Sequence, residues 1–175
     1  MQKVKVILVL FAGLIMLTSF NPDKKKKDLW QGWTEIQQLM QQQKKPIIID
    51  IYTDWCVYCK KMDASTYQND SVYNYMKEHF YRFRFNGESK DTLVWHDKKF
   101  AFNKLYQIHD FVQYVSQGSI VFPTTVIITP DGQPYSTGGM LKVKEMETLL
   151  KYYGTNAYQE KTFPEFSGQF QPIWK

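Results

Sequence analysis

The sequence predicts an α/β domain in which helices and strands alternate along the chain. Short apolar segments rich in β-branched residues, such as 47–51 and 124–128, have the character of buried strands. Other segments, such as 143–153, space their apolar residues as one face of a helix. The chain has 175 residues, of which 17% are aromatic, so it is long enough for one domain with its own hydrophobic core.

Residues 1–20 are expected to form a signal peptide or an N-terminal anchor. Lys3 and Lys5 precede an apolar run over 6–17, which is shorter than the roughly 20 residues of a membrane span and suits the core of a signal peptide. No cysteine stands directly after this run, which excludes a lipoprotein anchor. The leader is therefore either cleaved or retained as a membrane tether, and it predicts a periplasmic or other extracytoplasmic location. A buried first helix is the alternative.

Residues 21–29 are expected to form a polar linker. Four consecutive lysines at 24–27 make it a solvated spacer, with a contact to anionic lipid as the alternative. The formal net charge is +5, but without the six lysines of the leader and linker the chain has 16 basic and 17 acidic residues. The folded part is thus nearly neutral, and we expect no nucleic-acid partner.

The predicted domain spans 30–154 and begins with a helix. Trp33, Ile36 and Met40 lie on one helical face, Gly32 or Thr34 could cap its start, and Pro46 ends it. The strand over 47–51 follows and leads into a helix that starts near Cys56. The remaining predicted elements are a helix over 72–76, a strand over 81–85, a β-hairpin over 92–102 with a three-residue loop at 97–99, a helix over 108–117, strands over 124–128 and 133–136, and a helix over 143–153.

Two further segments stand apart from this alternation. The hairpin and the helix after it form an insert over 87–118. Residues 155–175 are aromatic and contain prolines, so we expect a C-terminal extension that packs on the domain without regular structure.

The only two cysteines, Cys56 and Cys59, lie where the buried strand meets its helix. A thiol at a helix N-terminus is close to unpaired N–H groups and to the positive end of the helix dipole, which favour the reactive thiolate. Cys56 is therefore the expected nucleophile, and Cys59 is placed to attack the mixed disulfide that Cys56 forms. A zinc site would need two further ligands, and only three scattered histidines exist, so we expect no metal and no cofactor.

Four features occur in the order found in a known family. They are Asp50 six residues before the first cysteine, the motif Trp55-Cys56-Val57-Tyr58-Cys59, the segment Phe122-Pro123-Thr124, and the glycine-containing pairs Asp131-Gly132 and Gly138-Gly139. With them, the segment 33–153 resembles the thioredoxin superfamily, which implies a central mixed sheet flanked by helices. The run 53–60 is most similar to exported thioredoxin-like proteins and to the C-terminal periplasmic domain of DsbD-type thiol–disulfide reductases.

The resemblance implies roles for several residues. Asp50 would be a buried acid that accepts a proton from Cys59 and has a raised pKa, whereas the alternative is a solvated aspartate at an edge. Arg84 occupies the place of a lysine near that acid in thioredoxins, or is there by chance on an alternating strand. The substrate-binding residues would be Trp55, Tyr58, Phe122, a cis Pro123 and Gly138. The alternative for each aromatic residue is the ordinary core.

The predicted function is that of an exported thiol–disulfide oxidoreductase which reduces protein disulfides through Cys56 and Cys59. Neither Val57 nor Tyr58 adds a positive charge to stabilise a thiolate, which favours a reductant over an oxidase or isomerase. Expected partners are disulfide-containing exported proteins and, as electron donor, a membrane thiol–disulfide reductase. The alternative from another class is a binding module whose insert and tail hold a protein partner.

Overall fold

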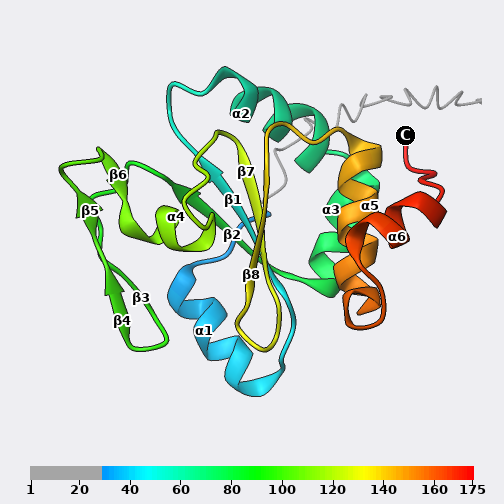
Figure 1. Ribbon diagram of the computed structural model, residues 1–175, viewed down its shortest axis with the longest axis horizontal. Coiled ribbons are helices and arrows are strands. Elements are labelled where there is room, and N and C mark those ends of the chain that lie inside the picture. Colours follow the sequence, from blue (N-terminus) through cyan, green and yellow to red (C-terminus); the bar gives the residue numbers. More distant parts are fainter. Residues whose placement is uncertain (1–28) are drawn as a thin grey trace, which may run out of the picture.

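In the computed structural model, which describes residues 29–175, a four-stranded mixed sheet has helices on both faces (Figure 1). The strand order is β2-β1-β7-β8, with β1 parallel to β2 and antiparallel to β7. The predicted leader and most of the predicted linker lie outside the described residues. The strands are β1 (Ile47–Tyr52), β2 (Tyr81–Asn86), β7 (Thr124–Ile128) and β8 (Pro134–Gly138).

Strand β1 is buried on both faces, which explains its continuous apolar run. Because side chains alternate along a strand, Ile47, Ile49 and Ile51 enter one core, while Ile48 and Asp50 face the other. The first core is covered by α1 (Trp33–Gln42) and α4 (Asp110–Val115), and the second by α2 (Val57–Met62), α3 (Asp70–His79) and α5 (Val143–Gly154). Asp50 therefore points into the layer that contains the helix of the two cysteines.

Helix α2 continues directly into a π-helical turn, η1 (Asp63–Tyr67). The predicted helix after Cys56 thus extends to Tyr67, and its second half faces the core, because Asp63, Thr66 and Tyr67 are buried. The side chain of Asn69 then starts α3 by accepting hydrogen bonds from two backbone N–H groups.

The insert contains the predicted hairpin, made of β3 (Leu93–Trp95) and β4 (Lys98–Phe100), but its predicted three-residue loop is wrong. The loop has two residues, His96 and Asp97, both with positive φ (48° and 61°), as in the tight turns that match strand twist. A second small hairpin, β5 (Phe102–Asn103) with β6 (Ile108–His109), follows. In Figure 1 both hairpins lie on the left, beside α4.

The helix predicted over 108–117 is shorter than expected. Its first two residues belong to β6, and α4 begins at Asp110 because the Nδ1 atom of His109 accepts a hydrogen bond from the N–H of Phe111 at 3.1 Å. His109 is fully buried, and its Nε2 lies 2.8 Å from the carbonyl oxygen of Asp91. This histidine therefore joins the insert loop to the start of α4.

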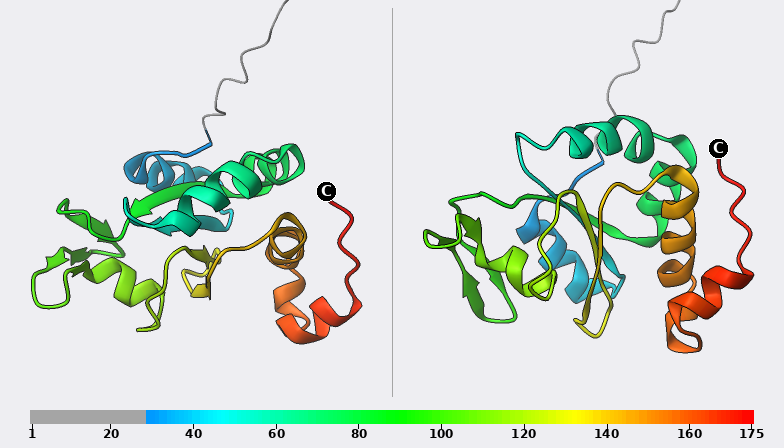
Figure 2. Two further views of the ribbon diagram at one scale, coloured as in Figure 1. Left: turned by 90° about the horizontal axis from the view of Figure 1, so that it is seen from above. Right: turned by 45° about the horizontal axis from the view of Figure 1, so that its top comes forward.

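The C-terminal extension has regular structure, so the prediction of an irregular tail is wrong. It forms a short 3-10 helix, η2 (Ala157–Gln159), and α6 (Phe163–Gln169), which starts with the capping pair Thr162 and Glu165. Beyond α6 the chain runs alongside α5, and the N–H of Trp174 donates to Oε2 of the buried Glu147 at 2.7 Å (Figure 2). The capping pair accounts for the start of this helix, and the aromatic composition of the tail made this local signal hard to recognise in the sequence.

Candidate active site

The two cysteines form a disulfide at the N-terminus of α2. The backbone N–H of Cys56 donates to the carbonyl oxygen of Thr53 at 3.2 Å, which closes the turn after β1. The Sγ atom of Cys56 accepts a hydrogen bond from the N–H of Cys59 at 3.0 Å. Cys56 thus caps the helix with its sulfur, the arrangement expected to favour a thiolate there when the pair is reduced.

Asp50 is 1% exposed and forms part of a buried charge cluster. Its register partner on β2 is Arg84, whose Nε lies 3.1 Å from Oδ2 of Asp50. The Nη1 atom of the same guanidinium lies 3.6 Å from Oδ2 of Asp63, and its plane lies over the ring of Tyr52. One cation is therefore placed between two carboxylates, and the alternative of a solvated Asp50 is wrong.

Burial raises the pKa of Asp50 to about 7. This pKa is the net result of opposing effects, because Arg84 lowers it, the carboxylate of Asp63 raises it and the phenol of Tyr67 lowers it. The pKa of Tyr67 itself is well above its usual value, because the phenol is fully buried and near Asp50. A carboxyl group with a pKa near neutrality can accept and return a proton under ordinary conditions.

Exposed aromatic side chains flank the nearly buried cysteines. Trp55 is 63% exposed and Tyr58 is 61% exposed, so the alternative that these two belong to the core is wrong. The indole Nε1 of Trp55 donates to Oε1 of Glu88 at 3.1 Å, and its ring meets the half-buried ring of Phe122 edge-on at 5.8 Å. We call Trp55, Tyr58 and Phe122 the aromatic rim.

The Phe122–Pro123 peptide bond is cis, and the loop that carries it contacts the end of β8. The N–H of Gly139 donates to the carbonyl oxygen of Pro123 at 2.8 Å. Gly138 pairs with Thr124, and a Cβ atom at Gly138 would collide with the side chain of Val121. Any larger residue at position 138 would therefore require the side chain of Val121 to move.

Three residues of this site were missed by the sequence analysis: Asp63, Tyr67 and Glu88. Asp63 could have been found, since it follows Cys59 by four residues and therefore lies on the same helical face. Glu88 could not, because its bond to Trp55 joins two loops that follow different strands. Of the predicted residues, Trp55, Cys56 and Cys59 follow β1, the ring of Trp55 contacts that of Phe122, and Asp50 faces the layer that contains α2.

The three histidines lie apart, and no group of side chains among residues 29–175 could hold a metal ion. His79 is close to Glu78, His96 stacks on Trp95, and His109 caps α4.

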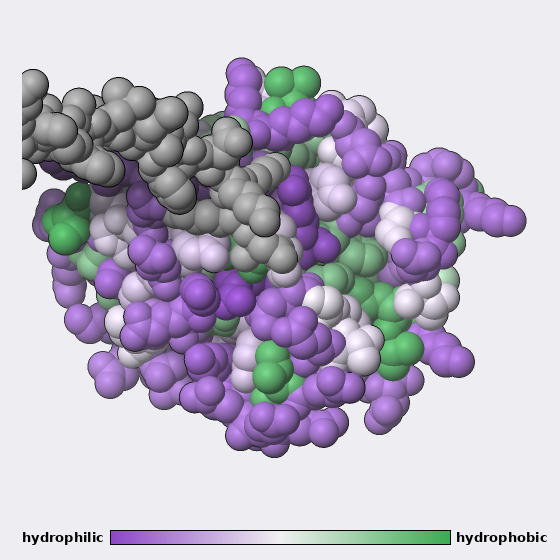
Figure 3. All heavy atoms as spheres, turned by 180° about the vertical axis from the view of Figure 1, so that it is seen from behind, coloured by the Kyte–Doolittle hydropathy of each residue, from purple (hydrophilic) through white to green (hydrophobic). Residues whose placement is uncertain are grey.

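Among residues 29–175, no helix is long and apolar enough to cross a membrane. The face seen from behind is mostly hydrophilic, with a few separate apolar patches (Figure 3).

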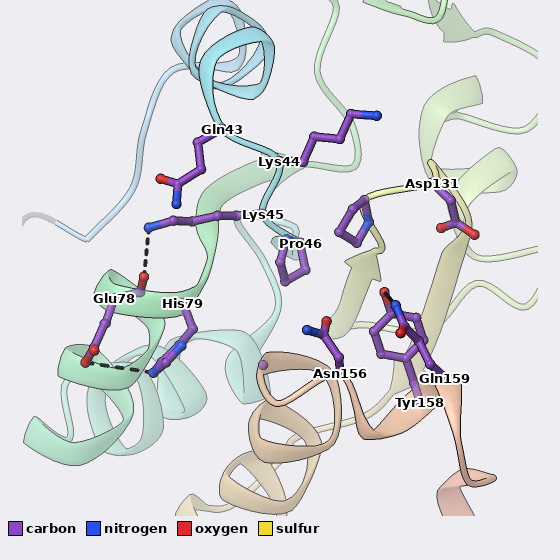
Figure 4. A pocket seen from close by; sticks show the side chains of 12 residues that line it. Gln43, Lys44, Lys45, Pro46, Glu78, His79, Asp131, Asn156, Tyr158 and Gln159 are labelled. Atoms are coloured by element: carbon purple, nitrogen blue, oxygen red, sulfur yellow. Dashed lines mark hydrogen bonds and ion pairs between the residues drawn. The ribbon is translucent and has the colours of Figure 1, made fainter.

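A polar hollow of about 750 Å³ lies at the opposite end of β1 from the cysteines, and Figure 4 shows side chains that line it. Its walls come from residues that precede β1, such as Lys44 and Pro46, and from those that follow β7, such as Asp131. The Nζ atom of Lys45 already donates to the carbonyl oxygen of Glu78 at 2.9 Å. None of the residues that line the hollow belongs to the cysteine site.

Comparisons with known proteins agree with this geometry. The sequence model of the thioredoxin-like domain matches residues 34–154, and the chain therefore belongs to the thioredoxin-like family. A thioredoxin-fold protein from Helicobacter pylori is 18% identical, with a TM-score of 0.52, over 72% of this chain and 80% of that protein. DsbH oxidoreductase is 17% identical, with a TM-score of 0.52, over 72% of this chain and 83% of its own. At these identities the likeness concerns the fold.

Sequence relatives match over a short stretch. The thiol:disulfide interchange protein DsbD of Yersinia pestis is 47% identical over 34 residues, which are 19% of this chain and 6% of the relative. DsbD of Vibrio vulnificus is 40% identical over 47 residues, 25% of this chain and 8% of the relative. The chain thus spans a small fraction of these relatives' length. The fold and the Cys56–Cys59 pair together support thiol–disulfide oxidoreductase chemistry.

Proposed function

We propose that this protein is an exported thiol–disulfide oxidoreductase that reduces disulfides in other exported proteins. The observation that carries the proposal is the placement of the Cys56–Cys59 pair at the start of α2, in the layer toward which the buried Asp50 points. The uncharged Val57 and Tyr58 between the cysteines favour the reducing direction. The leader favours a periplasmic or other extracytoplasmic location, with a tether if it is retained.

The reaction has two exchange steps. The Cys56 thiolate attacks a substrate disulfide, which forms a mixed disulfide and releases one substrate thiolate. Cys59 then transfers its proton to Asp50 and attacks Sγ of Cys56, which releases the second substrate thiolate and leaves the Cys56–Cys59 disulfide. Two electrons have passed to the substrate, and a dithiol donor, proposed to be a membrane thiol–disulfide reductase, must reduce the pair again.

Reduction of insulin disulfides, with dithiothreitol as electron donor, tests the proposal. Turnover that depends on both cysteines, together with a reduction potential in the range of reducing thioredoxins, is the expected result. An intact and reducible pair without turnover would instead favour the binding module, and a potential like that of a strong oxidant would reverse the direction.

In the reduced protein, Cys56 is expected to react with iodoacetamide about 10-fold faster than Cys59 or more, because its sulfur caps α2. Mass spectrometry of peptides after brief labelling measures both rates in one sample. Unfolding in urea should make the two rates similar, which serves as the control. Equal rates in the folded, reduced protein would contradict the assignment of the nucleophile.

Asp50→Asn is expected to slow the release of substrate from the mixed disulfide by about 10²-fold near pH 7, because the proton acceptor for Cys59 is lost. The first attack by Cys56 should change little, since it needs no proton acceptor once the thiolate is formed. Stopped-flow measurement of the two steps separates these effects. Asp54→Asn, which removes an exposed charge close to the cysteines, is the matched control. An unchanged release rate would exclude Asp50 as the acceptor.

A further inference from the structure

A cleft of about 570 Å³ lies beside the outer edge of β2 and is separate from the cysteine pair. α1 forms one wall, and the insert segment that leads into β3 forms the other. The residues that line it are Trp33, Thr34, Gln37, Phe83, Arg84 and Phe85, followed by Asn86, Ser89 and 91–94. The role inferred for this cleft rests on the proposed function.

Backbone hydrogen bonding shows which groups of β2 face the cleft. The N–H of Tyr81 donates to Pro46 and the N–H of Gly87 donates to Tyr52, so the odd-numbered residues of β2 bond to β1. The even-numbered residues Arg82, Arg84 and Asn86 therefore turn their backbone groups outward, because β2 is the edge strand of the sheet.

The chain itself pairs with the first of these outward positions. The N–H of Gln31 donates to the carbonyl oxygen of Arg82 at 2.8 Å, and the side chain of Gln31 accepts from the N–H of Arg82 at 3.2 Å. The chain then turns at Gly32 into α1. Among residues 29–175, no partner reaches the outward N–H and C=O of Arg84 or the N–H of Asn86, so the edge remains open where the cleft lies.

The other wall adds apolar surface and a fixed strand. The carbonyl oxygen of Val94 is held by the indole N–H of Trp33 at 2.8 Å and by the amide of Gln37 at 2.9 Å, which ties β3 to α1. Phe83 and Trp33 pack at 4.8 Å on the side of the sheet that faces α1. An open strand edge beside apolar side chains is the combination that binds an extended peptide as an added strand.

At Asn86, the last residue of β2, the cleft is connected to the aromatic rim by a chain of hydrogen bonds. The side-chain N–H of Asn86 donates to Oδ2 of Asp54 at 3.2 Å, and its Oδ1 accepts from the N–H of Glu88 at 2.9 Å. Glu88 in turn holds the indole of Trp55. A substrate polypeptide that is joined to Cys56 by a mixed disulfide, next to the aromatic rim, can therefore continue along the surface into the cleft.

We propose that this cleft binds an extended segment of the disulfide-containing substrate, which adds as a strand to β2 through the backbone of Arg84 and Asn86. The segment presents alternate apolar side chains to Phe83 and Trp33. The insert, through its segment 89–94, is thereby a substrate-binding element. It selects substrates whose chain is locally unfolded near the disulfide.

The test uses the oxidised protein and a capped octapeptide of alternating threonine and valine. The peptide has no cysteine, so binding is independent of thiol exchange. At saturating peptide, hydrogen exchange of the N–H groups of Arg84 and Asn86, followed by NMR, is expected to slow about 10-fold or more. The same peptide with N-methyl groups at alternate residues keeps its side chains but loses the donors of one edge, and it should give no protection.

Two variants test the location. Thr92→Trp fills the cleft from an exposed position and should weaken peptide binding about 10-fold or more, whereas Asn74→Trp, exposed on α3, should not change it. Protection confined to 122–124, or no protection at saturating peptide, would overturn the proposal even if Thr92→Trp failed to fold. Protection that grows with protein concentration in the absence of peptide would assign the edge to a second copy of this chain and also overturn it. Insulin turnover without peptide binding would support the reductase function and contradict the role of the cleft. Peptide binding without turnover would support the cleft as a binding site and contradict the reductase function.

Discussion

Between about pH 4 and pH 8, Asp50→Asn is expected to gain about 4 kcal/mol of stability relative to the unsubstituted protein. The buried carboxyl group of Asp50 has a pKa of about 7 in the folded state, against 3.8 as the ordinary value. As the pH rises from about 4 to about 7, Asp50 is ionised in the unfolded chain while it stays largely protonated in the folded protein, and above pH 7 it ionises in both states. The unfolded state therefore binds fewer protons, and the stability of the unsubstituted protein falls. An asparagine does not titrate, so the variant avoids this loss.

Urea unfolding at a series of pH values in this range measures the effect. Groups that do not interact with Asp50 contribute equally to both proteins, so the difference between their stabilities reports on Asp50 and on the groups coupled to it, Arg84, Asp63 and Tyr67. Asp54→Asn, which removes an exposed carboxylate by the same substitution, is the control. Parallel profiles for the unsubstituted protein and Asp50→Asn would show that the folded-state pKa of Asp50 is not raised.

The same burial accounts for both the cost in stability and the proposed chemistry. Arg84 is placed between Asp50 and Asp63, and its attraction lowers the pKa of Asp50 without offsetting the burial. A carboxyl group in water would be ionised at neutral pH and would be a weaker proton acceptor. We infer that the charge cluster persists because it places a proton acceptor in the layer of α2, although apolar side chains there would be more stable.

Local patterns were sufficient for the parts of the molecule that depend on short-range chemistry. The β-branched run over 47–51 and the cysteine spacing predicted β1 and the start of α2, whereas the buried position of Asp50 was implied by the family resemblance. The alternation over 81–85 predicted β2 but not its register. The pairing of Arg84 with Asp50 follows from that register, which depends on contacts distant in sequence.

The errors have different physical origins. The turn at His96 and Asp97 lacks glycine, so its two left-handed residues gave no turn signal. The start of α4 depends on the ring of His109, which is held by Asp91 from another loop. α6 is capped by Thr162 and Glu165, a local signal that the aromatic and proline-containing composition of the tail concealed.

Cys59→Ser is expected to trap substrates as mixed disulfides on Cys56 and to lower turnover on the order of 10³-fold. Attack needs only the Cys56 thiolate and access past the exposed Trp55 and the half-buried Phe122. Escape needs the second sulfur, and a serine hydroxyl cannot replace it because its alkoxide is not available at neutral pH. The N–H of residue 59 that bonds to Sγ of Cys56 is retained in this variant, so the first step should proceed.

The trapped adducts are measured on non-reducing gels after expression of residues 1–175, which include the predicted leader. They should survive denaturation, disappear when a reductant is added and be absent in Cys56→Ser, which is the matched control. Since disulfides persist mainly outside the cytoplasm, the trapped partners are expected to be exported proteins or the outer domain of a membrane reductase. Adducts that remain without Cys56 would show that Cys59 is the nucleophile, and a complete absence of adducts in cells would favour the binding module over the reductase.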